Sequence, residues 1–264
     1  MINITLFGTS RLHRPFCKKT KAGDIIDNIQ EGINVNFPKV GYFHTAAEIL
    51  QVIQWIKGVK DIPLDLRKYV FRIEPRPTTP RNEFDKNLED SIKNDQQYET
   101  KDFLEDTDVV VIEVSSLKEN FHSETSTYFH TNPNFSMNLT YKDIGAEGVY
   151  KKFFPDLGVS SVNCNEDNLL IQLHKIREEI YPAKLVVMGH IRSDTISIPL
   201  RDKIHDILLR INCDSGIFYF DNSEFLDKYG WASDPSGGVD KNHLSYEGET
   251  AIGIALQKFV KNII

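Results

Sequence analysis

Three residues that can cooperate in nucleophilic catalysis lie near the two ends of this chain. Ser10 follows Gly8 and Thr9, directly after a short apolar run. Asp240 and His243 are three positions apart near the C-terminus. A serine hydroxyl is a weak nucleophile unless a base takes its proton, and an acid can orient that base. At this spacing the carboxylate of Asp240 can face one nitrogen of His243 and leave the other for a hydroxyl.

Each of these residues also has a purely structural interpretation. Ser10 can act as a loop or helix-cap residue after a strand. Asp240 and His243 can simply form a turn, while Ser245 caps the helix that follows them. The two interpretations differ in one respect, because only catalysis requires Ser10 and His243 to meet.

The elements that must position these residues follow from hydrophobic patterning. Short apolar or β-branched runs predict strands, whereas apolar residues at helical spacing behind a capping residue predict helices. The strands are expected at residues 2–7, 69–73, 108–115, 184–188 and 217–220. The helices are expected at residues 45–58, 165–180, 199–211 and 246–264.

This alternation of strands and helices predicts a three-layer α/β/α sandwich with a mainly parallel sheet. The composition contains no linker that divides the chain, so residues 1–264 are expected to form one domain. A segment around residues 120–140 is interpreted as a lid or small hairpin. Chemistry in such folds lies at the carboxyl ends of the strands. That edge would hold Ser10, Ser115, His190 and the loop of Asp240.

Two short segments resemble a known family. GTSR at residues 8–11 and DKNHLSYEG at residues 240–248 resemble the first and last blocks of the SGNH/GDSL hydrolase superfamily. The resemblance implies a flavodoxin-like sandwich with Ser10 as nucleophile, Asp240 as orienting acid and His243 as general base. It also implies an oxyanion site that includes the backbone amide of Ser10.

The middle blocks of that superfamily match less well. Gly41 stands where the second block offers an amide to the oxyanion. The third block normally carries a glycine and an asparagine, but here the strand ends in Ser115 and Ser116. Ser115 is therefore a candidate oxyanion donor. Similar departures occur in the GSCFA and WcbI-like relatives of polysaccharide biosynthesis, which this chain resembles more faintly.

Several further side chains are candidates for substrate binding. Arg11 and Arg14 closely follow Ser10 in sequence and can hold a phosphate, a carboxylated sugar or coenzyme A, with Lys18 nearby. His190 follows a buried strand and can bind substrate or assist the oxyanion. The alternatives are a solvated basic rim for the arginines and a hydrogen-bonded structural role for the histidine. No residue spacing indicates a metal site.

Composition excludes several classes of protein. The formal charge of −7 disfavours a nucleic-acid partner, and no apolar run is long enough to span a membrane. The N-terminus reads as a buried strand, not as a signal peptide. The three cysteines form no metal or disulfide motif, which fits a cytoplasmic location.

These observations predict a serine esterase that removes an O-acyl group, specifically acetyl, from a carbohydrate through an acyl-serine intermediate. One alternative is an O-acyltransferase of surface-polysaccharide synthesis that uses a donor such as acetyl-CoA. Another is a catalytically weak module that binds a glycan or a nucleotide. The partner is a small molecule or glycan, no metal or redox cofactor is expected, and the oligomeric state is left open.

Overall fold

The computed structural model describes most of the chain, including both ends. The described residues are 1–19, 25–37, 42–63, 66, 70, 104–130, 158–211, 215–233 and 236–264, and for 17–19 and 25–27 only the backbone is described. The predicted strand at 69–73 lies almost entirely outside these ranges.

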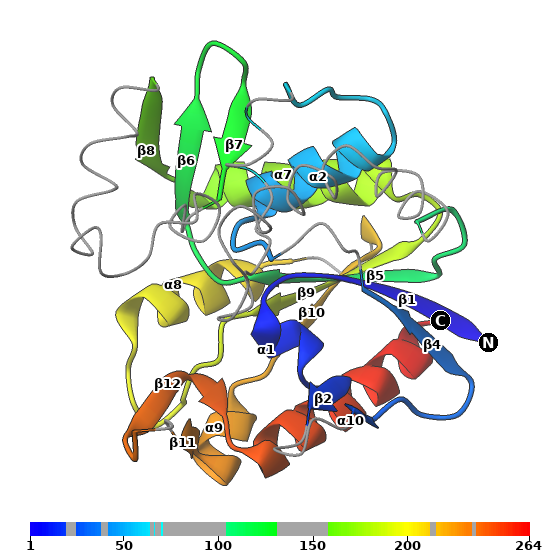
Figure 1. The fold of residues 1–264 in the computed structure, drawn as a ribbon, viewed down its shortest axis with the longest axis vertical. Helices are drawn as coiled ribbons and strands as arrows, with labels where there is room; N and C mark the ends of the chain where they lie inside the picture. The colour runs from blue at the N-terminus through cyan, green and yellow to red at the C-terminus, as the bar shows by residue number, and fades with distance from the viewer. Residues whose placement is uncertain are drawn as a thin grey trace, which may run out of the picture.

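A five-stranded parallel sheet forms the centre of the molecule (Figure 1). Its order is β4-β1-β5-β9-β10, in which β1 and β5 are adjacent although about a hundred residues separate them in sequence. This is the strand order 2-1-3-4-5 of flavodoxin-like folds, whose ligands bind where the order reverses. The strands are β1 Ile2–Phe7, β4 Ile33–Asn36, β5 Val109–Val114, β9 Lys184–Gly189 and β10 Ile217–Phe220. The predicted α/β fold class is confirmed.

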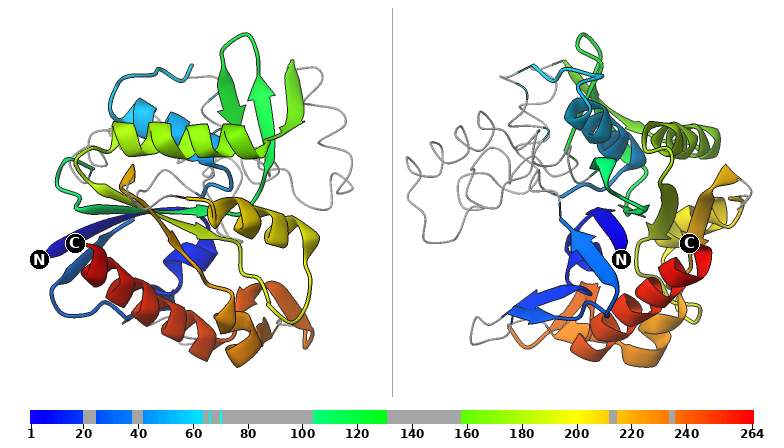
Figure 2. Two further views of the ribbon diagram at one scale, coloured as in Figure 1. Left: turned by 180° about the vertical axis from the view of Figure 1, so that it is seen from behind. Right: turned by 90° about the vertical axis from the view of Figure 1, so that its right-hand side faces the viewer.

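Helices cover both faces of the sheet (Figures 1 and 2). On one face lie α2 (Ala46–Ile56) and α7 (Glu166–Glu179), and the apolar side chains of α8 (Pro199–Leu208) join the same core. The other face carries the short α1 (Ser10–His13), α9 (Glu224–Tyr229) and the long α10 (Tyr246–Ile263). No helix in the described part of the chain is long and apolar enough to cross a membrane.

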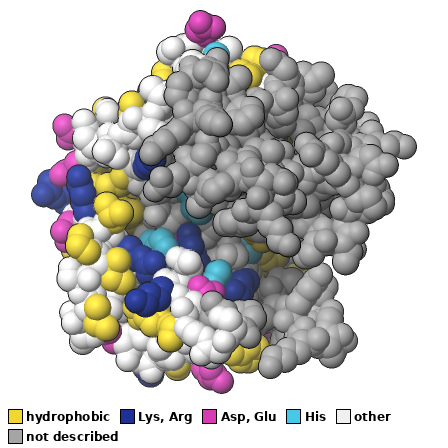
Figure 3. All heavy atoms as spheres, turned by 60° about the vertical axis from the view of Figure 1, so that its left-hand side comes forward, with side chains coloured by type: hydrophobic (Ala, Val, Ile, Leu, Met, Phe, Trp, Pro, Cys, Tyr) yellow, Lys and Arg dark blue, Asp and Glu magenta, His cyan; other side chains and the backbone are white. Residues whose placement is uncertain are grey.

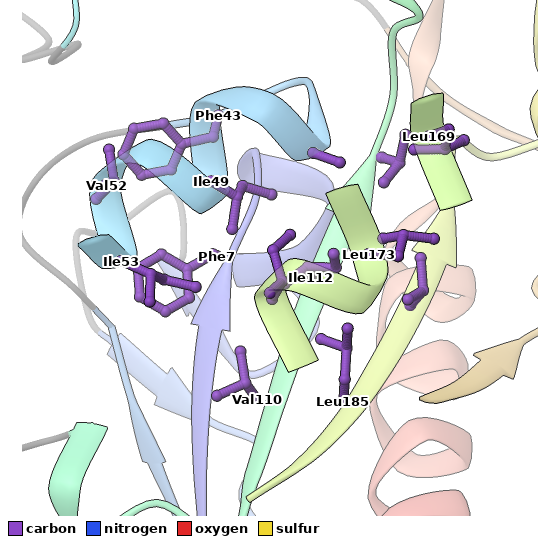
Figure 4. Packing of buried hydrophobic residues seen from close by; sticks show 14 of the residues in the cluster. Phe7, Phe43, Ile49, Val52, Ile53, Val110, Ile112, Leu169, Leu173 and Leu185 are labelled. Atoms are coloured by element: carbon purple, nitrogen blue, oxygen red, sulfur yellow. The ribbon is translucent and has the colours of Figure 1, made fainter. Parts of the chain in front are cut away.

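The central strand β5 separates two hydrophobic cores. Val110 and Ile112 point into the core under α2 and α7, where they meet Phe7, Ile49 and Leu173 (Figure 4). The alternate residues Val109 and Val111 belong to the core on the α10 side. All six residues of β5 are buried, as a strand covered on both faces requires.

The predicted helix starts are confirmed by their caps. The Thr45 hydroxyl accepts from the Glu48 amide at 3.2 Å, while the Glu48 carboxylate accepts from the His44 amide. Asn165 caps α7 and Ser245 caps α10 in the same way. Since α10 starts beside the carboxyl ends of the strands, its cap fixes where the chain just before it must lie.

A small antiparallel sheet lies beside α2 and α7. It consists of β6 (Lys118–His122), β7 (Thr127–Phe129) and β8 (Val159–Asn163), and β6 and β7 form a hairpin. The predicted excursion at 120–140 therefore includes part of this hairpin, and its residues from 131 onward lie outside the described residues. A second hairpin pairs β2 (Cys17–Lys19) with β3 (Ile25–Asp27).

The segment of Asp240 differs from the loop expected from sequence. Residues Val239–Leu244 form strand β12, which pairs with β11 (Trp231–Ser233). The pairing is irregular, because Trp231 pairs with Leu244 but Ala232 pairs with Asp240. Residues 241–243 therefore have no partner in β11. The side chains of Asp240 and His243 do not have to point to opposite faces as they would in a regular strand.

Candidate active site

Ser10 is the first residue of α1, immediately beyond the end of β1. Thr9 is the N-cap in an extended conformation, and its hydroxyl accepts weakly from the Arg11 amide at 3.3 Å. The Phe43 amide donates to the Gly8 carbonyl at 3.1 Å, which ties the exit of β1 to the start of the α2 segment. Ser10 thus lies at the carboxyl edge, between β1 and the neighbouring β5.

The structure brings the three predicted catalytic residues together in one hydrogen-bonded chain. Ser10 Oγ lies 2.7 Å from His243 Nε2, and His243 Nδ1 lies 2.6 Å from Asp240 Oδ2. The side chains of His243 and Asp240 are 18% and 30% exposed, so a ligand can approach this chain from solvent. This is the arrangement that a nucleophile, a base and an orienting acid require.

Electrostatics determine which atoms donate and which accept in these two hydrogen bonds. Burial opposes ionisation of Asp240, but hydrogen bonds from the Asn242 amide and His243, together with the charge of Arg14, outweigh it and hold the Asp240 pKa below its usual range. An ionised carboxylate only accepts hydrogen bonds, so Nδ1 of His243 must carry a proton. In the neutral imidazole Nε2 is then the acceptor and faces the Ser10 hydroxyl.

Arg201 on α8 forms hydrogen bonds that hold the segment of Asp240 and His243 in place. Its guanidinium donates to the Lys241 carbonyl and to the Ile191 carbonyl, both at 2.9 Å. It also lies 5.4 Å from the centre of the Trp231 ring on β11. Burial, followed by the nearby charge of Arg11, lowers the Arg201 pKa to about 10, so the group stays charged at neutral pH. Sequence reasoning missed Arg201, since nothing in the pattern of α8 distinguishes it.

Arg11 is buried and paired with Glu113 of β5. Arg11 Nε lies 2.5 Å from Glu113 Oε1, and the two side chains are 8% and 0% exposed. Glu113 was not among the predicted site residues, although a glutamate in an otherwise apolar strand was a visible signal. The predicted substrate contact of Arg11 remains a prediction, and its guanidinium already has a carboxylate partner.

The other predicted basic residues have varied surroundings. Arg14 lies beside Glu249 of α10 at 3.1 Å with its side chain 37% exposed, so it is the more accessible of the two arginines near Ser10. Arg192, a further basic residue shortly after β9, pairs with Asp194 and Asp202. The side chain of Lys18 lies outside the described residues.

His190 follows β9 and lies close to the Arg11–Glu113 pair. Its Nδ1 is 3.2 Å from the Ile191 carbonyl. Burial, and then the charges of Arg11 and Arg201, lower the His190 pKa to about 2, so the ring is neutral at physiological pH. A neutral ring can exchange hydrogen bonds with a ligand, and its predicted binding role stays a prediction.

The oxyanion residues predicted from sequence are only partly described. Gly41 lies outside the described residues. The hydroxyl of Ser115 lies 2.9 Å from His44 Nδ1, and the backbone amides of Ser115 and Ser116 both donate to the His44 carbonyl. His44, which the sequence did not single out, therefore joins the segment before α2 to the end of β5.

Charged and histidine side chains gather on one face of the molecule (Figure 3). Lysine or arginine, histidine and acidic side chains lie close together there. Within the described ranges, no group of three or more histidine, cysteine, aspartate or glutamate side chains is placed to hold a metal ion.

Comparison with known families gives one informative match. The family model described as the TviD N-terminal domain matches residues 2–132, just under half of the 264 residues. The matched part includes Ser10 and Glu113 but ends well before Asp240. This match does not name the SGNH superfamily, so that resemblance rests on the sequence motifs and the strand order. No curated protein and no solved structure gives a significant match.

Proposed function

We propose that this protein is a serine-dependent O-acyltransferase that acts on a glycan in polysaccharide biosynthesis. The observation that carries the proposal is the chain from Ser10 through His243 to Asp240, with contacts of 2.7 and 2.6 Å. The similarity to the TviD N-terminal domain, a family related to Vi polysaccharide biosynthesis, supports the biosynthetic setting. Acetyl is the proposed acyl group.

The proposed reaction has two halves. Ser10 Oγ attacks the acyl carbonyl of the donor while His243 Nε2 takes the serine proton. The tetrahedral intermediate then collapses, His243 returns that proton to the leaving group, and an acyl-serine ester remains. In the second half, His243 takes the proton of a sugar hydroxyl, which attacks the ester, and the proton returns to Ser10. Asp240 stabilises the imidazolium in both halves.

Stabilisation of the oxyanion is proposed to begin with the backbone amide of Ser10. Among the described residues, no backbone carbonyl accepts a hydrogen bond from that amide. An oxyanion donor contributes about 3 kcal/mol to transition-state stabilisation, so the missing asparagine of the third block predicts slow turnover of simple esters. Gly41 and Ser115 remain the further proposed donors.

A serine esterase is the second candidate, because the same three residues serve equally well when water replaces the sugar hydroxyl. A pure binding module is disfavoured, since binding alone does not require Ser10 to be hydrogen-bonded to His243 and His243 to Asp240. The acceptor thus separates the two leading candidates.

The test uses acetyl-CoA as donor and compares thiol release with and without O-deacetylated bacterial polysaccharide. A transferase releases thiol faster when acceptor is present and leaves acetyl esters on the polysaccharide. A hydrolase releases acetate at a rate that the polysaccharide does not change. Ser10→Ala should abolish either activity, and activity that survives in Ser10→Ala would contradict the proposal. Coenzyme A should also raise the melting temperature, and Arg14→Ala should reduce that shift if this accessible arginine contacts the donor.

A further inference from the structure

Glu113 is a charged residue in the most completely buried strand of the sheet. The six residues of β5 are Val109, Val110, Val111, Ile112, Glu113 and Val114. Glu113 is 0% exposed and shares its face of the sheet with Val109 and Val111, on the side of α1 and α10. Burying a carboxylate there is unfavourable unless donors surround it.

The donors that surround Glu113 come from the two residues that flank Ser10. On the N-terminal side, the Thr9 amide and the Thr9 hydroxyl donate to Oε2 at 2.9 and 2.5 Å. On the C-terminal side, Arg11 Nε donates to Oε1 at 2.5 Å. One carboxylate therefore holds the chain both before and after the proposed nucleophile.

The backbone before Ser10 is also packed closely against Glu113. A Cβ atom added to Gly8 would lie 2.7 Å from Glu113 Cβ and 3.3 Å from its backbone nitrogen. Any side chain at position 8 would push the turn away from β5. Gly8 is thus required by this close approach, and the approach in turn depends on where Glu113 lies.

Local structure alone cannot hold Ser10 in place. Helix α1 has only four residues, and a helix this short has little stability of its own. A buried ion pair is also seldom the most stabilising choice for a core, because apolar side chains of similar volume often serve as well. The pair of Arg11 and Glu113 is therefore better explained by what it positions than by the stability it adds.

We propose that Glu113 is a positioning residue that holds the turn of Thr9, Ser10 and Arg11 so that Ser10 Oγ stays within reach of His243. This inference rests on the proposed function. Glu113 does not touch the reacting atoms, and it acts by fixing both neighbours of the nucleophile. The ionised carboxylate suits this role. Although burial opposes its charge, Arg11 and the Thr9 hydroxyl help to keep its pKa below the usual range.

The test measures how fast Ser10 reacts with a fluorophosphonate, a probe that needs no knowledge of the natural substrate. The serine oxygen displaces fluoride and forms a phosphonyl ester, whose position peptide mass mapping reports. Glu113→Gln keeps the side-chain volume but removes the charge, and it places an amide group against donors that require an acceptor. Since a displacement of about 1 Å can slow a reaction about a hundredfold, the labelling rate should fall at least about tenfold.

The fall should appear in the maximal labelling rate, with little change in the probe concentration that gives half of that rate. A merely structural role would not produce this split. The matched control is Glu119→Gln, which removes the buried carboxylate of Glu119 on β6, an acceptor for the Gln172 side chain of α7. It should leave the labelling rate within about twofold of wild type, because Glu119 lies away from Ser10 and its partners.

A second pair of variants tests the same contact from the other side. Thr9→Ser keeps the hydroxyl that donates to Glu113 and should label at close to the wild-type rate. Thr9→Val has nearly the same shape without the hydroxyl and should label at least about tenfold more slowly. If Glu113→Gln does not fold, the comparison between these two variants decides the matter alone.

The outcomes separate this inference from the proposed function. A wild-type protein that the probe does not label at Ser10 overturns the proposed function and the inference with it. A labelled wild type with a folded Glu113→Gln variant of equal rate overturns the inference alone. Equal rates in Thr9→Ser and Thr9→Val do the same.

Discussion

Replacing Asp240 with asparagine is expected to disable the site while leaving the fold intact. The two carboxylate oxygens have different partners, because Oδ1 accepts from the Asn242 amide at 2.9 Å and Oδ2 contacts His243 Nδ1 at 2.6 Å. Asparagine has one oxygen for two donors. If that oxygen stays on the Asn242 amide, the side-chain NH₂ faces Nδ1, and the imidazole must move its proton to Nε2.

A proton on Nε2 removes the acceptor that the Ser10 hydroxyl needs. In serine sites of this type the same substitution lowers kcat by about 10⁴-fold, which corresponds to about 5 kcal/mol of transition-state stabilisation. If the oxygen turns to Nδ1 instead, the NH₂ meets the Asn242 amide and leaves a donor unsatisfied at a cost of about 1–3 kcal/mol. The structure favours the first arrangement, since the backbone amide cannot change its role.

Two measurements check this expectation. The rate of p-nitrophenyl acetate turnover should fall by about 10⁴-fold in Asp240→Asn, and nitrogen-15 NMR should show the His243 proton on Nε2 instead of Nδ1. The control is Asp108→Asn, since Asp108 accepts from the Asn3 amide at the amino edge of the sheet, away from Ser10. A loss of less than about tenfold, or an unchanged tautomer, would show that Asp240 does not set the protonation of His243.

Two predictions concern stability. In Gly253→Ala the new Cβ would lie 2.5 Å from the Pro15 carbonyl oxygen. This clash should outweigh the gain in helix propensity, so the free energy of unfolding measured in urea should fall by about 1–3 kcal/mol. A more stable variant would contradict this packing. The pKa values of His13 and His190 are lowered to about 4 and about 2, chiefly by burial. Each depressed value adds stability that is present above about pH 6.5 and is lost as the pH falls toward the folded-state value, so unfolding at pH 5 should cost about 2 kcal/mol less per histidine than at pH 7. His13→Gln should make this dependence shallower, and equal stability at both pH values would show that the rings are not held neutral.

Much of the fold could be predicted from sequence because its signals are local. The β-branched run of β5 and the caps at Thr45, Asn165 and Ser245 each depend on residues a few positions apart. The spacing of Asp240 and His243 likewise predicted that these two would pair, and the resemblance to the SGNH/GDSL superfamily implied that Ser10 would join them. The catalytic roles of these three residues are still a prediction that the geometry supports.

The rest depended on contacts between distant parts of the chain. Arg11 and Glu113 are 102 positions apart, and Arg201 and Lys241 are 40 apart. No periodic pattern reports which buried charge will meet which partner across two strands. Strand β12 and its irregular pairing with β11 were also missed, because the glycine and proline residues between Trp231 and Asp240 suggested a loop.

In the proposed mechanism, Ser10 carries the acyl group between donor and acceptor. The most direct measurement is to mix the protein with p-nitrophenyl acetate, quench with acid within the first turnover, and map the acetylated peptide by mass spectrometry. We expect a single acetyl group on Ser10, its absence in Ser10→Ala, and much slower formation in His243→Ala. An acetyl group on another residue, or turnover with no acetyl-enzyme at any quench time, would show that Ser10 is not the nucleophile.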